Sequence, residues 1–279
     1  METAIQIQNV WKIFGERPQD ALRAIREKGL SKAQVLAEYN AVVGVADVNL
    51  SVNRGEIFCI MGLSGSGKST LVRLLLDIDK PDSGRVRHGF DLIPAYFDQR
   101  RETLDRDRSP WTTLSEDGSD MIKVAGRTKH VTSYLRDFMF DDVKMNQRVS
   151  TLSGGEQNRL LLAKLFAQSH NFLVLDEPTN DLDIATIEIL EQSLLEFKGA
   201  ILLISHDRYL MGQVCQRYWG FCGRGALNAY ASVSQWIGEL RKKDKEPRAK
   251  NLTEKTQKEL KKSPVKLSYK EKRAVGILY

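Results

Sequence analysis

Apolar and polar residues follow one another along the chain in a pattern that predicts alternating strands and helices. Residues 4–14 alternate apolar and polar side chains, which is the period of a half-buried strand. Shorter strand-like runs follow at 48–52 and 56–61. The apolar runs 171–176 and 200–205 are bounded by polar turns, as expected for buried parallel strands. Because strands alternate with helical segments, we expect an α/β fold.

Helices are predicted first at residues 16–40, which favour two short helices. Gly29 is expected to end the first of them, because a glycine just after a helical pattern is a common stop signal. Ser31 and Gln34 have the spacing of a capping box, in which two residues exchange hydrogen bonds at a helix start. The second helix is therefore expected to begin after Ser31.

Further along, a helix is expected to begin near Gly67 and to include residues 69–78. Residues 98–146 are polar and irregular, with one good helix candidate at 130–140. The chain shows no internal repeat. The sequence thus predicts one continuous α/β arrangement with a less regular middle section.

The composition is typical of a soluble globular protein with one large or two modest domains. The chain has 279 residues, of which 42% are hydrophobic. No apolar run approaches the roughly 20 residues that cross a bilayer. Residues 1–10 lack the basic and then apolar pattern of a signal peptide. Cys59, Cys215 and Cys222 suggest neither a disulfide framework nor a zinc site, so we expect a reducing, cytoplasmic setting.

Positive charge is concentrated at the C-terminal end. The chain has a net charge of +6, whereas residues 241–279 alone hold 14 Lys or Arg and 5 Asp or Glu, a net charge of +9. Such a basic, proline-interrupted segment is expected to be flexible in isolation. A charge division of this kind also indicates a polyanionic partner such as nucleic acid, although a plain solvated linker is the alternative.

Residues 62–69, GLSGSGKS, match the phosphate-binding loop G-x-x-x-x-G-K-[ST]. Glycines let successive backbone N–H groups turn inward onto phosphates, and the following helix directs its positive end at the anion. Lys68 is expected to reach the β- and γ-phosphates, and Ser69 to bind Mg²⁺. The loop follows an apolar strand and opens a helix, so we favour this over an ordinary glycine turn. The residues expected to hold the nucleotide are Gly62, Leu63, Ser64, Gly65, Ser66, Gly67, Lys68, Ser69 and Thr70.

Four carboxylates occur within VLDEPTNDLD, residues 174–183. Neighbouring carboxylates repel one another, so stability alone does not explain them. Asp176 ends an apolar strand, where a P-loop enzyme holds Mg²⁺, and Glu177 follows in a position that suits a general base. An acidic helix start, favoured by the helix dipole, is the alternative and accounts in part for Asp181.

A second anion site is predicted at residues 151–165, where Ser153, Gly154 and Gly155 precede an amphipathic helix. Small residues at a helix N-terminus leave its N–H groups open to an anion. An ordinary capped helix is the alternative. One nucleotide needs only one P-loop, so a second anion site requires a separate explanation.

The explanation comes from a resemblance to the ATP-binding cassette (ABC) superfamily. LSGGEQ at 152–157 resembles its signature motif, FLVLDE at 172–177 its Walker B motif, and NDLD at 180–183 its D-loop. In that family two cassettes enclose two ATP molecules, and the signature of one faces the nucleotide of the other. The resemblance therefore implies ATP and Mg²⁺ as ligands and a second cassette, identical or different, as a partner.

The resemblance also implies roles for individual residues. His206 is similar to the switch histidine and Gln99 to the Q-loop glutamine, so the implied catalytic residues are Glu177, His206 and Gln99. Phe14 is similar to the aromatic residue that stacks on adenine. The implied contacts of the signature and D-loop with nucleotide are Ser153, Gly154, Gly155, Glu156 and Asp183. The implied metal ligands are Ser69, Gln99 and Asp176.

The fold that this resemblance implies is a P-loop NTPase of the ABC nucleotide-binding type. It would have a RecA-like core, an antiparallel β subdomain and a helical signature subdomain. We expect the domain to span residues 1–240, with a helical insert at 16–43 and the helical subdomain at about 100–165. Residues 241–279 would be the basic tail.

Two branches of the superfamily are resembled in different parts of the chain. Residues 1–84 resemble the ATPase subunit of glycine betaine/proline importers, notably in EKGLSKAQVL at 27–36. Residues 85–279 resemble the second cassette of ABC-F proteins of the Uup type, notably in LDEPTNDLDIATIEILE at 175–191. The changeover near Gly84 suggests a hybrid or engineered chain.

The favoured function is that of a soluble ABC-F-like ATPase that acts on the ribosome or on nucleic acid, because the signature region belongs to that part. The alternative is the ATP-hydrolysing subunit of an osmoprotectant importer, which would need a membrane permease as partner. A third possibility is a module that binds ATP and barely hydrolyses it.

Overall fold

The computed structural model describes residues 2–98, 104–115, 117–124, 126–180, 182–222 and 225–242. The chain divides into two units, Met1–Gln235 and Trp236–Tyr279. The described part of the second unit, residues 236–242, is helical.

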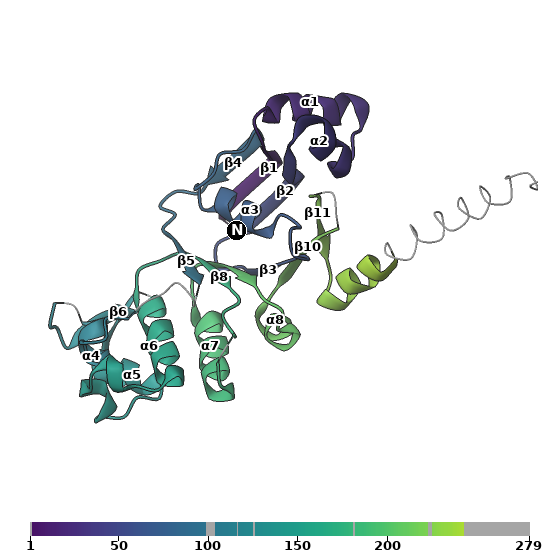
Figure 1. Ribbon diagram of the computed structural model, residues 1–279. Helices are drawn as coiled ribbons and strands as arrows, with labels where there is room; N and C mark the ends of the chain where they lie inside the picture. The colour runs from purple at the N-terminus through teal and green to yellow at the C-terminus, as the bar shows by residue number, and fades with distance from the viewer. Residues whose placement is uncertain are drawn as a thin grey trace, which may run out of the picture. The chain divides into compact units, whose positions relative to one another are not determined.

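A six-stranded sheet forms the centre of this unit (Figure 1). Its strands, in spatial order, are β11 (Leu227–Tyr230), β10 (Arg217–Phe221), β3 (Ile57–Met61), β9 (Ala200–Ile204), β8 (Phe172–Asp176) and β5 (Pro94–Asp98). All neighbours pair in parallel except β11, which is antiparallel to β10. Every residue of β3 and β9 is buried, which explains their continuous apolar sequences. The predicted α/β class and the predicted strands at 171–176 and 200–205 are confirmed.

A second, antiparallel sheet has the order β2–β1–β4, with β1 (Thr3–Phe14), β2 (Val42–Asn53) and β4 (Ser83–His88). The strand predicted at 4–14 is confirmed, whereas the run at 48–52 is only the end of the 12-residue strand β2. The register of β1 and β2 shifts several times, and Asn9 and Asp47 have positive φ at these irregularities. The alternation of β1 buries one of its faces against the main core.

Between β1 and β2 the chain forms two helices, α1 (Pro18–Lys28) and α2 (Lys32–Tyr39). Gly29 ends α1 in the left-handed conformation, with φ of 66°. Ser31 and Gln34 form the predicted capping box of α2. Leu22 and Val35, one from each helix, share a small apolar cluster with residues of β1 and β2. Both predicted helices and their end signals are thus confirmed.

The other helices place the loops that matter for function. They are α3 (Lys68–Leu75), α4 (Pro110–Leu114), α5 (Val131–Asp137), α6 (Gly154–Ala167), α7 (Ile184–Glu196) and α8 (Arg208–Val214), with 3-10 turns η1 (Lys144–Asn146) and η2 (Val149–Thr151). Helix α3 ends earlier than the predicted residue 78, since Asp77 turns the chain with a positive φ. The helix predicted at 130–140 is α5, shorter by three residues at its end.

The middle section is more regular than the sequence predicts. Besides α5 it contains α4 and the two-stranded hairpin of β6 (Met121–Val124) and β7 (Arg127–His130). Figure 1 shows α4, α5 and α6 grouped with β6, and α4 packs on both α5 and α6. These elements are too short for a periodic pattern to predict them, and packing on α6 contributes to their stability.

Candidate functional site

The predicted phosphate loop connects the buried strand β3 to helix α3. Gly65 and Gly67 have φ of 71° and 115°, a conformation that favours glycine. A Cβ atom added to Gly67 would lie 2.2 Å from the carbonyl oxygen of Gly44 in β2. The third glycine of the motif is therefore required by close packing of the loop on the neighbouring sheet.

Two polar side chains of this loop, Ser66 and Lys68, are placed to contact a phosphate. The Oγ of Ser66 is buried and has no hydrogen-bond partner. The ammonium of Lys68 donates to the carbonyl of Gly62 in its own loop. Buried polar atoms normally find partners, and phosphate oxygens would satisfy both groups. The residues present thus fit the phosphates of a nucleotide.

At the end of β8, Asp176 accepts a hydrogen bond of 2.8 Å from the hydroxyl of Tyr96 in β5. Sequence reasoning did not single out Tyr96, although it lies three residues before the predicted Gln99. The hydrogen bond fixes the carboxylate that was predicted to bind Mg²⁺. Mg²⁺ typically takes one or two protein ligands and completes its shell with phosphates and water, so Ser69 and Asp176 are a suitable pair.

Glu177 has a positive φ of 50°, which is rare for a residue with a side chain. Its N–H donates to the carbonyl of Ile204 at 2.7 Å, so the turn is held by the end of β9. A strained backbone that tertiary contacts impose is a common feature of functional sites.

The structure brings Glu177 and His206 together, as their predicted catalytic roles require. Nε2 of His206 lies 3.3 Å from Oε1 of Glu177, and the N–H of His206 donates to Oε2 at 3.2 Å. The histidine side chain is 82% exposed, so it faces the solvent. A carboxylate held in this way can accept a proton from water, while the contacts from His206 keep it oriented.

Phe14, predicted to stack on adenine, lies beside the phosphate loop helix. A Cβ on Gly44 would approach both Cε2 of Phe14 and Cγ2 of Thr70, at 3.0 and 2.8 Å. The ring is 42% exposed, and Nζ of Lys12 lies 5.7 Å from its centroid. An exposed aromatic face next to the first turn of α3 is consistent with the predicted stacking role.

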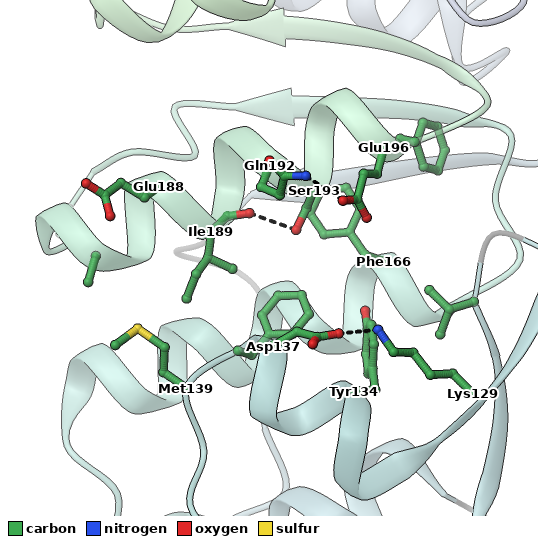
Figure 2. Close-up of a pocket in the computed structure, with 14 residues that line it drawn as sticks. Lys129, Tyr134, Asp137, Met139, Phe166, Glu188, Ile189, Gln192, Ser193 and Glu196 are labelled. Carbon is green, nitrogen blue, oxygen red and sulfur yellow. Dashed lines mark hydrogen bonds and ion pairs between the residues drawn. The ribbon is translucent and has the colours of Figure 1, made fainter.

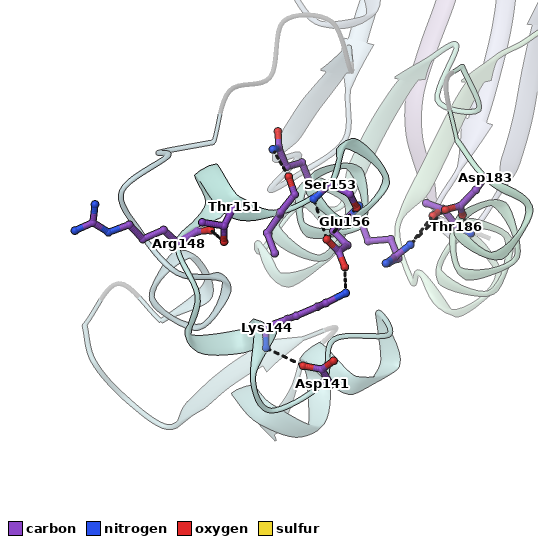
Figure 3. Close-up of polar contacts among 11 residues, drawn as sticks. Asp141, Lys144, Arg148, Thr151, Ser153, Glu156, Asp183 and Thr186 are labelled. Atoms are coloured by element: carbon purple, nitrogen blue, oxygen red, sulfur yellow. Dashed lines mark hydrogen bonds and ion pairs between the residues drawn. The ribbon is translucent and has the colours of Figure 1, made fainter.

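The predicted second anion site is the start of α6. Ser153, labelled in Figure 3, is the N-cap. Gly154 and Gly155 are the first residues of the helix. Gly154 is exposed and a Cβ added there would meet nothing within 4 Å. The capping box places the Ser153 hydroxyl 2.9 Å from Oε2 of Glu156. The start of α6 is exposed, and phosphate binding there stays a prediction.

Glu156 was predicted to contact nucleotide, but its carboxylate lies within the protein. It is buried, accepts from both the N–H and the hydroxyl of Ser153, and forms an ion pair with Lys144 (Figure 3). The hydrogen bond from Lys144 and those from Ser153 lower the pKa of Glu156 to about 2. Its position indicates that it holds Ser153 rather than the ligand.

Because folding lowers this pKa, Glu156 should stabilise the protein above its ordinary pKa of 4.5 and lose that contribution as the pH falls toward 2. We expect the unfolding free energies of wild type and Glu156→Gln to differ at pH 7 and to converge between pH 4.5 and 2. Urea unfolding at several pH values measures this. A difference that is constant over that range would contradict the expected linkage.

Asp183, the last predicted contact of the D-loop, is the N-cap of α7. It accepts from the N–H of Thr186 at 2.7 Å and pairs with Arg159 of α6 at 3.4 Å. These hydrogen bonds from Thr186, with the charge of Arg159, lower the pKa of Asp183. Its Oδ2 lies 3.1 Å from a Cβ built on Gly155. The carboxylate therefore connects the start of α7 with the signature helix. Of the four carboxylates within residues 174–183, Asp183 thus serves as a helix cap.

Two predicted residues, Gln99 and Asp181, lie outside the described residues. The remaining site residues fall on separate elements, with the phosphate loop before α3 and the signature before α6. A cavity of about 550 Å³ lies elsewhere, among residues of α5, α6 and α7 that include Tyr134, Phe166 and Ile189 (Figure 2). None of the predicted site residues that the structure describes lines it.

The sequence of this chain also matches known proteins. Residues 45–180 match the family model described as ABC transporter. This range includes the phosphate loop, Asp176, Glu177 and the signature. The fold is that of an ABC ATPase domain. Among the residues that the structure describes, none of the helices has the length and hydropathy needed to span a membrane.

The chain is similar to ATP-binding proteins named Uup and to a translational throttle protein. The chain is 39% identical to the ATP-binding protein Uup of Haemophilus influenzae over 241 residues, which are 81% of this chain and 37% of that protein. It is 44% identical to Uup of Escherichia coli over 186 residues, 67% of this chain and 29% of that protein. The energy-dependent translational throttle protein EttA of Escherichia coli is 36% identical over 204 residues, 73% and 37% of the two chains. The chain thus spans about a third of the length of these relatives.

Proposed function

We propose that this chain is an ABC-F-like ATPase that hydrolyses ATP in a composite site formed with a second cassette. The proposal rests mainly on Glu177, whose carboxylate directly follows Asp176 and contacts His206. This is the arrangement of a general base beside a metal ligand, at the carboxyl end of a strand in a P-loop fold. The proposed cofactor is Mg²⁺, and a reducing cytoplasm is the proposed setting.

Each group has a role in this proposal. The N–H groups of the phosphate loop and the ammonium of Lys68 bind and orient the β- and γ-phosphates. Ser69 and Asp176 hold Mg²⁺, which neutralises charge on the phosphates when it is bound. Glu177 accepts a proton from the attacking water, and His206 stabilises the carboxylate and orients it. Phe14 provides a face for the adenine, and the Q-loop residue Gln99 remains a proposed ligand by resemblance alone.

The composite site explains the second anion site. Ser153, Gly154 and Gly155 open a helix that is remote in sequence from the phosphate loop of the same chain, and the exposed start can bind the γ-phosphate that a partner presents. Two identical chains can satisfy one another in this way about a two-fold axis. A different cassette in the same role is the alternative partner.

A direct test is the oligomeric state of Glu177→Gln, in which ATP should bind and persist. We expect this variant to sediment as a dimer with ATP and Mg²⁺ and as a monomer with ADP. The same variant with Lys68→Ala added should stay monomeric, because it lacks the phosphate contact. Monomers in both nucleotide states at high protein concentration would contradict pairing of identical chains.

The ABC-F assignment is supported by the names of the relatives. Uup is named as an ATP-binding protein, and the name of EttA, energy-dependent translational throttle protein, describes a role in translation. We infer from these relatives that the ribosome or nucleic acid is the partner. The importer reading, with a membrane permease as partner, rests only on the resemblance of residues 1–84. Sedimentation with ribosomes, rather than stimulation by a permease, would support the ABC-F assignment.

The net charge of +9 on residues 241–279 favours binding to a polyanion. We expect the full-length protein to bind duplex DNA and structured RNA with little sequence preference. Its affinity should fall steeply as the salt concentration rises. If about five phosphates are contacted, log K against log salt should have a slope of about −4 on duplex DNA. A chain that ends at Leu240 should keep ATPase activity and lose most of this binding. An unchanged slope after truncation would place the contact surface on the cassette.

A further inference from the structure

Two carboxylates lie next to the start of the signature helix, where an anion is proposed to bind. Glu156 is three residues after the N-cap Ser153, and the Oδ2 of Asp183 lies 3.1 Å from a Cβ built on Gly155. A negative charge beside the N–H groups of Ser153, Gly154 and Gly155 would repel a phosphate. Something must therefore offset these two charges for the site to function.

Each of the two carboxylates has its own cation. Asp183 pairs with Arg159, whose side chain is 13% exposed. Glu156 pairs with Lys144, and the side chain of Glu156 is only 10% exposed (Figure 3). Lys144 lies 12 positions before Glu156, in the turn η1 that precedes the signature. Neither cation belongs to the signature motif itself.

The position of Lys144 is fixed independently of the signature. Its backbone N–H donates to Oδ1 of Asp141 at 2.8 Å, which closes the turn before η1. Met145, the next residue, is buried and anchors the same turn. The ammonium thus reaches Glu156 from a rigid support, whereas its own side chain remains 43% exposed. An amine held in this way can orient a carboxylate without leaving the solvent.

Glu156 in turn fixes Ser153. One carboxylate oxygen, Oε2, lies 2.9 Å from both the N–H and the Oγ of Ser153. The other oxygen, Oε1, faces Lys144. Loss of Lys144 would leave a buried carboxylate with no cation, and such a group either takes up a proton or turns toward water. Either change alters the hydrogen bond that orients the Ser153 hydroxyl.

We propose that Lys144 is a positioning residue of the composite ATP site, which holds Glu156 against Ser153 and offsets its charge beside the anion-binding start of α6. The proposal rests on the proposed function, since the anion is the γ-phosphate that the partner cassette presents. The low pKa of Glu156 supports it, because Lys144 is the first cause of that shift. The hydrogen bonds of Lys144 go to Asp141 and Glu156, which both lie outside the phosphate loop.

The test measures ATP-dependent pairing in the Glu177→Gln parent. Lys144→Met should weaken the dimer by about tenfold or more, since hydrogen bonds to charged groups contribute more than neutral ones. Affinity of the monomer for a fluorescent ATP analogue should be unchanged, because that site lies on α3. Lys144→Arg, which keeps the cation, should restore most of the pairing.

The decisive comparison uses Glu156→Gln, which keeps a side chain suited to the capping box and removes the charge. In this background Lys144→Met should have little effect on pairing, because no carboxylate remains to be offset. A matched control is Arg136→Met, which removes an exposed cation paired with Asp142 in the same part of the chain. That variant should pair like the parent.

The outcomes separate this proposal from the proposed function. If the Glu177→Gln parent does not form dimers with ATP, the proposed pairing is wrong, and the role of Lys144 in it falls too. If the parent pairs and Lys144→Met pairs equally well, only the role of Lys144 is overturned. If Lys144→Met weakens pairing equally in the background that keeps Glu156 and in the background that carries Glu156→Gln, the role of Lys144 is also overturned. Its effect would then not depend on the carboxylate of Glu156. Far-UV circular dichroism identifies a variant that fails to fold, and Lys144→Arg then decides.

Discussion

Replacing Glu177 with glutamine is expected to lower the rate of ATP hydrolysis by about 10²- to 10⁴-fold, the usual contribution of a general base. The amide has nearly the same shape, so it can keep the hydrogen bond from the N–H of His206, but it cannot accept a proton from water. ATP should still bind, since the phosphate loop is unchanged. Release of inorganic phosphate under single-turnover conditions measures the chemical step.

Glu188→Gln is the matched control for this change. Glu188 is an exposed residue of α7, and the same loss of one carboxylate there should leave hydrolysis unaffected. Lys68→Ala should instead weaken ATP binding itself, because it removes the charge that faces the phosphates. Equal rates in wild type and Glu177→Gln would rule out Glu177 as the base and would leave the fold assignment untouched.

Gly67→Ala should reduce the affinity for ATP by about 100-fold or more. The new Cβ would lie 2.2 Å from the carbonyl oxygen of Gly44, and φ of 115° is a region that alanine avoids. The loop must therefore move, and two lost hydrogen bonds to phosphate cost about 3 kcal/mol or more, which is about 100-fold in affinity. Titration with a fluorescent ATP analogue measures the loss.

The control for this prediction is Gly212→Ala in helix α8. A Cβ added there meets nothing within 4 Å. Alanine is a better helix former than glycine, so the free energy of unfolding should rise by up to about 1 kcal/mol while ATP affinity is unchanged. If Gly67→Ala binds ATP as tightly as wild type, the close approach of the loop to β2 does not determine nucleotide binding.

The sequence alone was sufficient for features whose cause is local. The alternation in β1, the uniformly apolar β3 and β9, and the capping box of Ser31 and Gln34 each depend on residues within a few positions of one another. Local patterns of this kind determine which face is buried and where a helix starts, so they can be recognised without coordinates.

The phosphate loop and the Asp176–Glu177 pair were predicted for the same reason. A nest of N–H groups requires glycines at fixed offsets, and a metal ligand at a strand end requires a carboxylate directly after an apolar run. Several short elements of the middle section were not predicted. The hairpin β6–β7 and helix α4 have no periodic pattern, and packing against α6 contributes to their stability.

Only the tertiary structure could reveal the groups that support the site. The hydroxyl of Tyr96 reaches Asp176 across 80 residues, and Arg159 reaches Asp183 across 24. Lys144 meets Glu156 because the turn at η1 brings the chain back onto the signature helix. Such contacts depend on the path of the chain between the two residues, and charged side chains are common at positions that make no contact at all. The sequence therefore determined which residues can do the chemistry, whereas the fold decided which neighbours hold them in place, since long-range ion pairs and hydrogen bonds have no local signature.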